Sequence, residues 1–224
     1  MDYAYDVIII GGGVVGSSIA RELSKYKLNT CVLEKELDVC CETSGRNSGV
    51  LHAGFNNKAG SLMAKFCVEG NENFDEIAKE LDIPFKRTGK LVVGFNEEDK
   101  EKLIKMKEQG EANGVKGLEI INKDKIRKLS PYVEGNFALY SPQTGILNPF
   151  IYTIAMAENA VSNGVKYFLD NEVLDIKKVL EKESSIFKIK TNKNVYRSKW
   201  LINSAGLNSD KIGKMMEIED YTIY

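Results

Sequence analysis

The sequence predicts an α/β fold built around a parallel sheet, and three features predict it. A β-branched run at residues 5–10 has the composition of a fully buried parallel strand. It leads through a glycine cluster into an amphipathic helix, and an apolar run at 30–34 closes a βαβ unit of about 30 residues. Short strand-like runs return between residues 165 and 203, after a further helix. Together these features favour a sheet covered by helices.

The composition is ordinary for a soluble globular protein. Of the 224 residues, 43% are hydrophobic and 28% are charged, which suits one large domain or two small ones. The formal net charge of -1 argues against a broad electrostatic footprint for nucleic acid, although it is compatible with a local basic patch. We therefore expect no nucleic-acid partner.

The sequence offers little for a membrane span or a metal centre. No stretch approaches the roughly 20 apolar residues of a spanning helix. Acidic Asp2 and Asp6 flank the first strand, so we expect no signal peptide. The four cysteines form no C-x-x-C pair and His52 is the only histidine, so we expect no metal. Reduced thiols point to the cytoplasm, with the protein either free there or peripheral to a membrane.

The first half of the chain alternates strand, helix and loop signals. The helix after the glycine cluster places Val15, Ile19 and Leu23 on one face. Residues 38–60 are rich in Ser, Gly, Asn and Cys and predict a long irregular loop, which in a compact domain is usually functional. A helix is predicted at about 71–82 and a strand at 91–95.

Helix caps and short elements mark the remainder of the chain. Asn96 is placed to cap a charged helix over 97–109, and Asn122 a short one that stops before Pro131. The other elements that the pattern predicts are a strand at 138–140, a helix with a stripe of Ile151, Ile154, Ala157 and Val161 that ends near Gly164, strands at 166–169, 172–179, 185–191 and 195–203, and a short helix after Asn203-Ser204-Ala205-Gly206. Residues 221–224 resemble the start of a strand, so we expect a chain truncated at its C-terminus.

The glycine cluster matches the mechanism of a dinucleotide-binding turn. Gly11 would make the tight turn, Gly13 would let the backbone approach a pyrophosphate, and Gly16 would let the helix pack close to the strand. The helix N-terminus then offers free N–H groups and a positive dipole end to phosphates. The same pattern alone also occurs in glycine-rich βα turns of other α/β proteins.

An acidic residue in the right place strengthens the dinucleotide interpretation. Glu34 ends the second strand, 18 residues after Gly16, close to the expected spacing of about 20. Its carboxylate can accept both hydroxyls of an adenosine ribose, and it would repel a 2′-phosphate, which disfavours NADP. The βαβ unit by itself does not distinguish FAD from NAD.

The loop after the second strand distinguishes an FAD-binding domain from an NAD-binding one. An NAD-binding domain would usually continue with another βα unit, whereas here small and polar residues run from Glu42 to Gly54. With this loop, the βαβ unit, the 140–149 segment and the 203–206 turn, the sequence resembles the D-amino-acid-oxidase-like FAD-dependent oxidoreductases. It is most similar to the branch with FAD-linked glycerol-3-phosphate dehydrogenases and L-2-hydroxyglutarate oxidases.

The resemblance implies FAD as cofactor and a set of residues around it. The loop at 43–52 would run beside the pyrophosphate and the isoalloxazine, Val173 would hold the adenine through its backbone, and Ala205-Gly206 would bring the chain back over the dinucleotide. A simple strand-to-helix turn is the alternative for Ala205-Gly206. The full expected set is Gly11, Gly13, Val14, Val15, Gly16, Glu34, Lys35, Thr43, Ser44, Asn47, Ser48, Gly49, Leu51, Val173, Ala205 and Gly206.

The implied reaction is oxidation of a carbon that bears a hydroxyl, with hydride passing to the flavin. His52 is the candidate base, since its unperturbed pKa near 6.5 suits proton transfer at neutral pH; alternatively it only packs on the flavin or hydrogen-bonds to it. Arg46 either pairs with an anionic group of the FAD or of the substrate, or faces solvent. Lys86, Arg87 and Lys90 fit a solvated charged edge better than a site that attracts an acidic substrate. Cys40-Cys41 are expected to be plain thiols rather than flavin contacts.

We thus expect a Rossmann-like FAD/NAD(P)-binding domain from residues 1–83 and 148–224, interrupted by a partial α+β substrate (cap) domain at 84–147. The expected function is that of a flavoprotein oxidoreductase acting on a small hydroxy acid or sugar phosphate. Glycerol-3-phosphate is the first candidate substrate and L-2-hydroxyglutarate the second. Family members are roughly twice as long, so the alternative is a flavin-binding module without activity of its own, which needs a partner or the missing C-terminal half.

Overall fold

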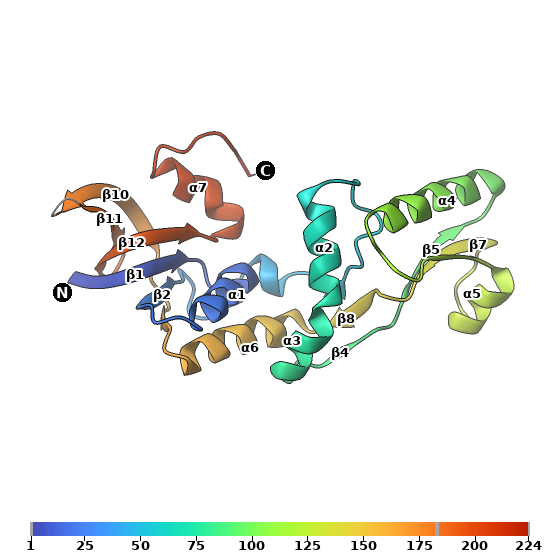
Figure 1. Cartoon of the computed structure of the whole chain (residues 1–224), viewed down its shortest axis with the longest axis horizontal. Coiled ribbons are helices and arrows are strands. Elements are labelled where there is room, and N and C mark those ends of the chain that lie inside the picture. Colours follow the sequence, from blue (N-terminus) through green and yellow to red (C-terminus); the bar gives the residue numbers. More distant parts are fainter. Residues whose placement is uncertain (1, 182–183, 224) are drawn as a thin grey trace. The chain divides into compact units, whose positions relative to one another are not determined.

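The structure, a computed structural model, describes residues 2–181 and 184–223 and consists of two compact units (Figure 1). The first unit runs up to Asn47 and resumes at Pro149, and the second runs from Ser48 to Asn148. Residues 48–83, which sequence patterns grouped with the first domain, lie in the second unit, because strand β3 (Val50–Leu51) pairs there with β8 (Gly145–Leu147). The inserted unit therefore begins earlier than the expected boundary at residue 84.

The first unit is built on a six-stranded sheet of order β10-β11-β12-β1-β2-β9. β12, β1, β2 and β9 run parallel to their neighbours in this order, while β10, β11 and β12 form an antiparallel meander. The bounds of the strands are β1 Asp2–Ile10, β2 Thr30–Leu33, β9 Lys166–Phe168, β10 Val173–Glu181, β11 Ser184–Thr191 and β12 Val195–Asn203. This arrangement confirms the predicted α/β fold with a parallel sheet.

Helices cover both faces of this sheet (Figure 1). Helices α1 (Val14–Leu23) and α6 (Pro149–Ser162) pack on one face, where Ala20 and Ala160 meet Ile9. On the other face, Ile212 of helix α7 (Ser209–Lys214) joins a core with Ile8 and Ile10. Alternate residues of β1 thus face opposite cores, as the strand period requires.

The buried side of α6 differs from the predicted apolar stripe. Ile151, Ile154 and Val161 are exposed, whereas the buried residues of the helix are Thr153, Met156, Ala157 and Ala160. Small side chains allow α6 to lie against α1, and the Thr153 hydroxyl donates to the Pro149 carbonyl at 2.9 Å. Helix–helix contact, rather than the largest apolar residues, therefore sets the orientation of α6.

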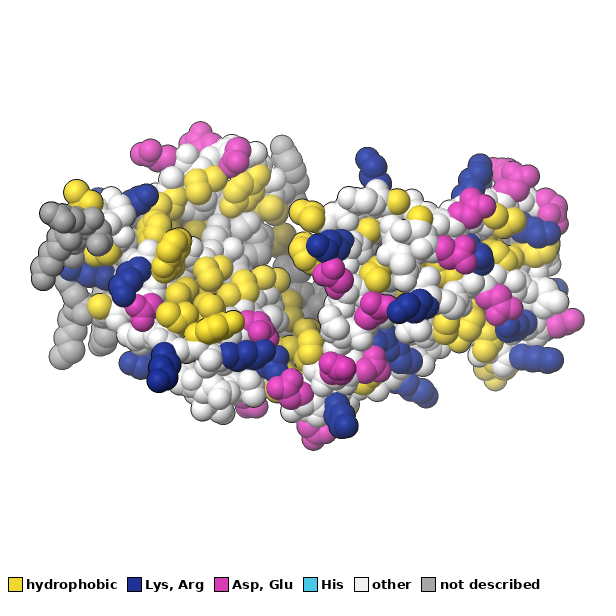
Figure 2. All heavy atoms as spheres, in the orientation of Figure 1, with side chains coloured by type: hydrophobic (Ala, Val, Ile, Leu, Met, Phe, Trp, Pro, Cys, Tyr) yellow, Lys and Arg dark blue, Asp and Glu magenta, His cyan; other side chains and the backbone are white. Residues whose placement is uncertain are grey.

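The second unit contains two three-stranded antiparallel sheets, ordered β3-β8-β4 and β5-β7-β6. Neighbouring residues of β7 face opposite sides, so Leu139 packs with Leu103 of helix α4 and Ala138 with Ile126 of helix α5. Figure 2 shows side chains of both charges interspersed around α4. The remaining bounds are β4 Phe85–Lys86, β5 Lys90–Gly94, β6 Glu119–Asn122, β7 Phe137–Ser141, α2 Leu62–Glu72, α3 Phe74–Glu80, α4 Glu97–Ala112 and α5 Lys123–Leu129.

Both predicted helix caps are confirmed. The Asn96 side chain accepts from the Asp99 N–H at 2.9 Å, and that of Asn122 accepts from the Lys125 N–H at 3.1 Å. Each bond satisfies one of the N–H groups that the first turn of a helix leaves without a partner.

Two other predictions about secondary structure were wrong. The helix expected at 71–82 is the end of α2 followed by α3, with Asn73 between them. The part of α2 before residue 71 was not predicted, and its apolar residues Leu62, Met63 and Phe66 are exposed. Residues 221–223 form no strand, and Tyr224 lies outside the described residues.

Candidate functional site

The glycine turn brings the end of β1, the start of α1 and the chain after β12 into close contact. Gly11 has φ +104°, a region that favours glycine, and an added Cβ would lie 2.5 Å from the Ser204 carbonyl oxygen. A Cβ at Gly16 would lie 2.0 Å from the Gly11 carbonyl oxygen. Glycine is therefore required at both positions because backbone oxygens of the same unit come too close to leave room for a Cβ.

Helix α1 opens without a cap from its own N-cap residue. Gly13 is the N-cap and has no side chain to bond the first turn. Ser44, from the short 3₁₀ turn Thr43–Gly45, takes that place: its Oγ accepts from the Val14 N–H at 2.9 Å. The polar loop thus reaches the N-terminus of α1 across 30 residues of sequence, and its hydroxyl lies where an anion would meet the helix dipole.

Glu34 lies beside the same turn, almost fully buried. Its Oε2 accepts from the Gly12 N–H at 2.5 Å, and its Oε1 accepts from the Glu36 N–H at 2.9 Å. A carboxylate offers about four acceptor positions, so each oxygen keeps capacity for one more donor. The neighbouring Lys35 does not point to this carboxylate: its ammonium pairs with Glu42 at 2.8 Å and Glu36 at 3.1 Å, and hydrogen bonds to these two raise the Lys35 pKa.

The strand-to-helix connection after β12 lies directly on the glycine turn. The Ser204 hydroxyl donates to the Ile10 carbonyl at 2.7 Å, and the Ala205 Cα lies 3.2 Å from the Cβ position of Gly11. Gly206 has φ +53° and starts a 3₁₀ turn, Gly206–Asn208. This connection is therefore held against the turn by the hydrogen bond of Ser204.

The approach to β10 also borders Glu34. The Asn171 N–H donates to the Glu34 carbonyl at 2.8 Å, and the Asn171 amide oxygen accepts from the Tyr196 hydroxyl at 2.9 Å. Val173 begins β10, and its side chain is buried in the core with Tyr196. Its side chain is therefore not available, and only the backbone of Val173 could make the contact with the adenine that the resemblance implies.

Other expected residues of the first unit lie on its surface. Arg46 is exposed, and its Nε donates to the Cys41 carbonyl at 3.1 Å. Asn47 is exposed and donates to the Ser44 carbonyl at 2.8 Å, while Val15 is 59% exposed at the start of α1. All four cysteines are free thiols, and Cys40 is buried with its Sγ 3.7 Å from the Pro149 carbonyl.

The rest of the expected set lies in the second unit. The Gly49 carbonyl accepts from the Leu147 N–H at 2.9 Å, and Leu51 belongs to β3. Ser48 and His52, on either side, are exposed. Residues 48–52 are thus a short strand with its flanks rather than an entirely irregular loop.

His52 has a pKa below its ordinary value. Partial desolvation is the larger cause, although the residue is exposed overall, and the positive charge of Lys90 is the smaller one. Both effects disfavour the imidazolium form. The neutral form of the ring therefore predominates at pH 7, and it is the form that can accept a proton.

Replacing Lys90 by methionine is expected to raise the pKa of His52 toward its ordinary value, because one of the two causes of the shift is removed. If a reaction rate requires neutral His52, that rate would begin to fall at a higher pH in the variant than in the wild type when the solution is acidified. An NMR titration measures this directly, since His52 is the only histidine. An unchanged or lower pKa in Lys90→Met would contradict the assigned cause, and Lys116→Met serves as a control for loss of a lysine.

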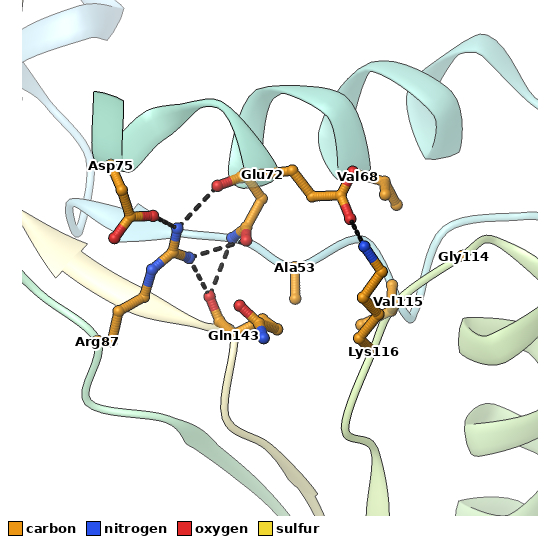
Figure 3. Close-up of a pocket in the computed structure, with 10 residues that line it drawn as sticks. Ala53, Val68, Glu72, Asp75, Arg87, Gly114, Val115, Lys116 and Gln143 are labelled. Carbon is orange, nitrogen blue, oxygen red and sulfur yellow. Dashed lines mark hydrogen bonds and ion pairs between the residues drawn. The ribbon is translucent and has the colours of Figure 1, made fainter. Parts of the chain in front are cut away.

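A polar cluster that sequence patterns did not indicate lies beneath the His52 segment. Asn71 of α2 is 3% exposed and bonds Arg87, whose guanidinium also donates to the Gln143 carbonyl and pairs with Asp75 (Figure 3). Arg87 therefore does not belong to the solvated charged edge that was expected for it. The cluster borders a cavity of about 290 Å³, which is also lined by the Glu72–Lys116 ion pair at 2.7 Å.

Within residues 2–181 and 184–223, no group of three or more His, Cys, Asp or Glu side chains could hold a metal ion. Over the same described residues, none of the helices is long and apolar enough to cross a membrane.

Known proteins resemble this chain along nearly its whole length. The model of the DAO family, described as "FAD dependent oxidoreductase", matches residues 6–224. A glycerol 3-phosphate dehydrogenase of Caloramator mitchellensis is 48% identical over 95% of this chain and 44% of its own length. A mitochondrial L-2-hydroxyglutarate dehydrogenase of Nematostella vectensis is 38% identical over 94% of this chain and 49% of its own length.

The chain is also similar to a solved structure. The L-alpha-glycerophosphate oxidase of Mycoplasma pneumoniae, with FAD bound, matches with a TM-score of 0.86 and 29% identity, over 95% of this chain and 56% of that one. The chain thus spans about half the length of these relatives.

Proposed function

Because the chain belongs to the DAO family of FAD-dependent oxidoreductases, we propose that it binds FAD and takes part in oxidising a small hydroxy compound. The observation that carries this proposal is the N-terminus of α1. Its N-cap is a glycine, its first amide meets a hydroxyl from the polar loop, and a buried carboxylate lies beside the turn. This combination has the chemistry of a site for a diphosphate joined to a ribose.

The residues around this turn fit the dinucleotide part of FAD. The amides at Gly13, Val14 and Val15 would bind the diphosphate, with Gly11 and Gly16 making room for the turn. Glu34, which has one acceptor position left on each oxygen, would bind the ribose hydroxyls. We propose that these further residues border the cofactor: Lys35, Thr43, Ser44, Asn47, Ser48, Gly49, Leu51, Val173, Ala205 and Gly206.

Replacing Gly13 by valine is expected to weaken FAD binding by at least about tenfold, because the loss of 1.4 kcal/mol or more of phosphate contact has that effect. The fold should persist, since the Cβ added at Gly13 would approach only the Ser44 side chain, whose hydroxyl at 2.9 Å can rotate away. Equilibrium dialysis with FAD measures the affinity, and Gly70→Ala is the control. A folded Gly13→Val protein with unchanged affinity would refute the diphosphate site.

In the proposed reaction, bound FAD would accept the hydride from the substrate carbon. The neutral His52 would accept the hydroxyl proton, a role that rests on the family resemblance and on the lowered pKa. Arg46, exposed and bonded through only its Nε to a backbone carbonyl, keeps its terminal N–H groups for an anionic group of the substrate or cofactor.

Glycerol-3-phosphate is the first candidate substrate, supported by the names of the 48% identical relative and of the matching oxidase structure. L-2-hydroxyglutarate is the second, supported by the relative that is 38% identical. Because the chain spans about half of these proteins, the alternative is a flavin-binding module that turns over no substrate alone.

An absorption spectrum separates these possibilities. The purified protein loaded with FAD is mixed without oxygen first with glycerol-3-phosphate and, in a second sample, with L-2-hydroxyglutarate. Bleaching of the flavin band by one of them identifies the substrate. A yellow protein that neither compound bleaches favours the silent module, and a protein that retains no flavin at all would contradict the proposed function.

A further inference from the structure

We propose that Asn71 is a positioning residue, which with Arg87 fixes the segment carrying His52; the catalytic meaning of this inference rests on the proposed role of His52. The segment needs such support. His52 directly follows β3, a strand of only two residues that is paired with β8. Because β3 has only two paired residues, the backbone of His52, the next residue, lies outside the β-ladder.

Asn71 supplies the missing support from α2. Its Nδ2 donates to the His52 carbonyl at 3.0 Å and to the Gln143 carbonyl at 3.0 Å. Gln143 precedes β8, the partner strand of β3. One amide group thus ties the end of β3 to the chain that enters its partner.

The chemistry of Arg87 fixes which way this amide faces. A guanidinium only donates hydrogen bonds. Its Nη1 donates to the Asn71 Oδ1 at 2.8 Å, and its Nη2 donates to the Asn71 backbone carbonyl at 2.8 Å. The NH₂ group must therefore face the two carbonyls, and the ion pair with Asp75 holds Arg87 itself in place (Figure 3).

The environment makes this support rigid. Asn71 is 3% exposed, so water does not readily replace its hydrogen bonds. The Cys67 thiol, one turn earlier in α2, adds a weak contact to the His52 carbonyl at 3.5 Å. The position of the imidazole thus depends on the hydrogen bond that Asn71 makes to the backbone of His52.

The test uses Asn71→Asp, which keeps the shape and the acceptor for Arg87 but removes the NH₂ donor. The full chain is labelled with ¹³C at the histidine carbonyl and ¹⁵N in alanine. Since His52 is the only histidine and Ala53 follows it, this gives a single carbonyl–amide cross-peak. We expect that peak to move upfield in Asn71→Asp, as for a carbonyl that has lost a hydrogen bond, and the ring signals of His52 to shift. The control is Asn136→Ala, which removes an asparagine hydrogen bond to the Phe95 carbonyl in the same unit. It should change neither the carbonyl–amide cross-peak nor the ring signals of His52.

The second readout is flavin reduction in FAD-loaded protein with the substrate identified above. Asn71→Asp should slow reduction about tenfold to hundredfold at saturating substrate, with bound flavin unchanged, because misplacement of a catalytic group by about 1 Å costs this much. If Asn71→Asp does not fold, Arg87→Lys replaces it, since it keeps the charge but loses the fork that orients Asn71.

Unmoved His52 signals in a folded variant would overturn the inference, and so would moved signals with an unchanged reduction rate when His52→Ala itself slows reduction. Failure of the proposed function has a different signature. The NMR signals would respond as expected, but flavin would be reduced at the same rate in wild type and in His52→Ala.

Discussion

Replacing Gly16 by alanine is expected to lower the free energy of unfolding by about 3 kcal/mol, the upper end of what overpacking typically costs. The added Cβ would lie 2.0 Å from the Gly11 carbonyl oxygen and 2.7 Å from the Ser204 Oγ. The Ser204 side chain can rotate away, but the Gly11 carbonyl belongs to the turn between β1 and α1. The helix would have to move off the sheet, and urea unfolding measures the cost.

Gly70 provides the matched control. It also lies in a helix, α2, and an added Cβ there would have nothing within 4 Å. Gly70→Ala should therefore raise the free energy of unfolding by roughly 0.5–1 kcal/mol, because alanine loses less backbone entropy. Equal effects of the two substitutions would show that contact with the turn does not determine the need for glycine at position 16.

Replacing His52 by alanine is expected to slow flavin reduction about 10²–10⁴-fold, the usual contribution of a general base. FAD should still bind, because the residues proposed for the diphosphate and the ribose lie in the first unit. Anaerobic stopped-flow measurement of the flavin band, with the substrate that bleaches the wild type, gives the rate.

His52→Gln separates proton transfer from packing. Glutamine resembles the imidazole in size and hydrogen bonding but cannot accept a proton near neutral pH. If His52 is the base, the glutamine variant should be about as slow as the alanine variant. A glutamine variant with a near wild-type rate would leave His52 only a packing or hydrogen-bonding role.

Local sequence signals predicted the glycine turn and the helix caps well. The turn between β1 and α1 depends on nearby glycines, and Asn96 and Asn122 bond residues three positions along the chain. The match of the family over residues 6–224 confirms the resemblance that was stated from the βαβ unit, the polar loop up to Gly54, the 140–149 segment and the 203–206 turn. The helix caps are visible in the sequence because the groups that interact are close together along the chain.

Contacts between residues far apart in the sequence were harder to predict. The loop containing Ser44 was predicted to lie near the cofactor only through resemblance, since nothing local indicates that its hydroxyl would reach the amide of Val14. The Asn71–Arg87 cluster had no signal at all, because an asparagine within a helix is usually an exposed residue. Tertiary packing also overrode the isoleucine stripe of α6, which faces outward while Ala157 and Ala160 are buried.

The N-terminus of α1 and Glu34 are proposed to bind the diphosphate and the ribose of FAD. A crystal structure of the full chain grown with FAD tests this proposal most directly. We predict phosphate oxygens within hydrogen-bond distance of the Val14 amide, with the Ser44 hydroxyl turned to the ligand, and ribose hydroxyls on Glu34. FAD bound elsewhere, with Ser44 still on the Val14 amide, would contradict the account.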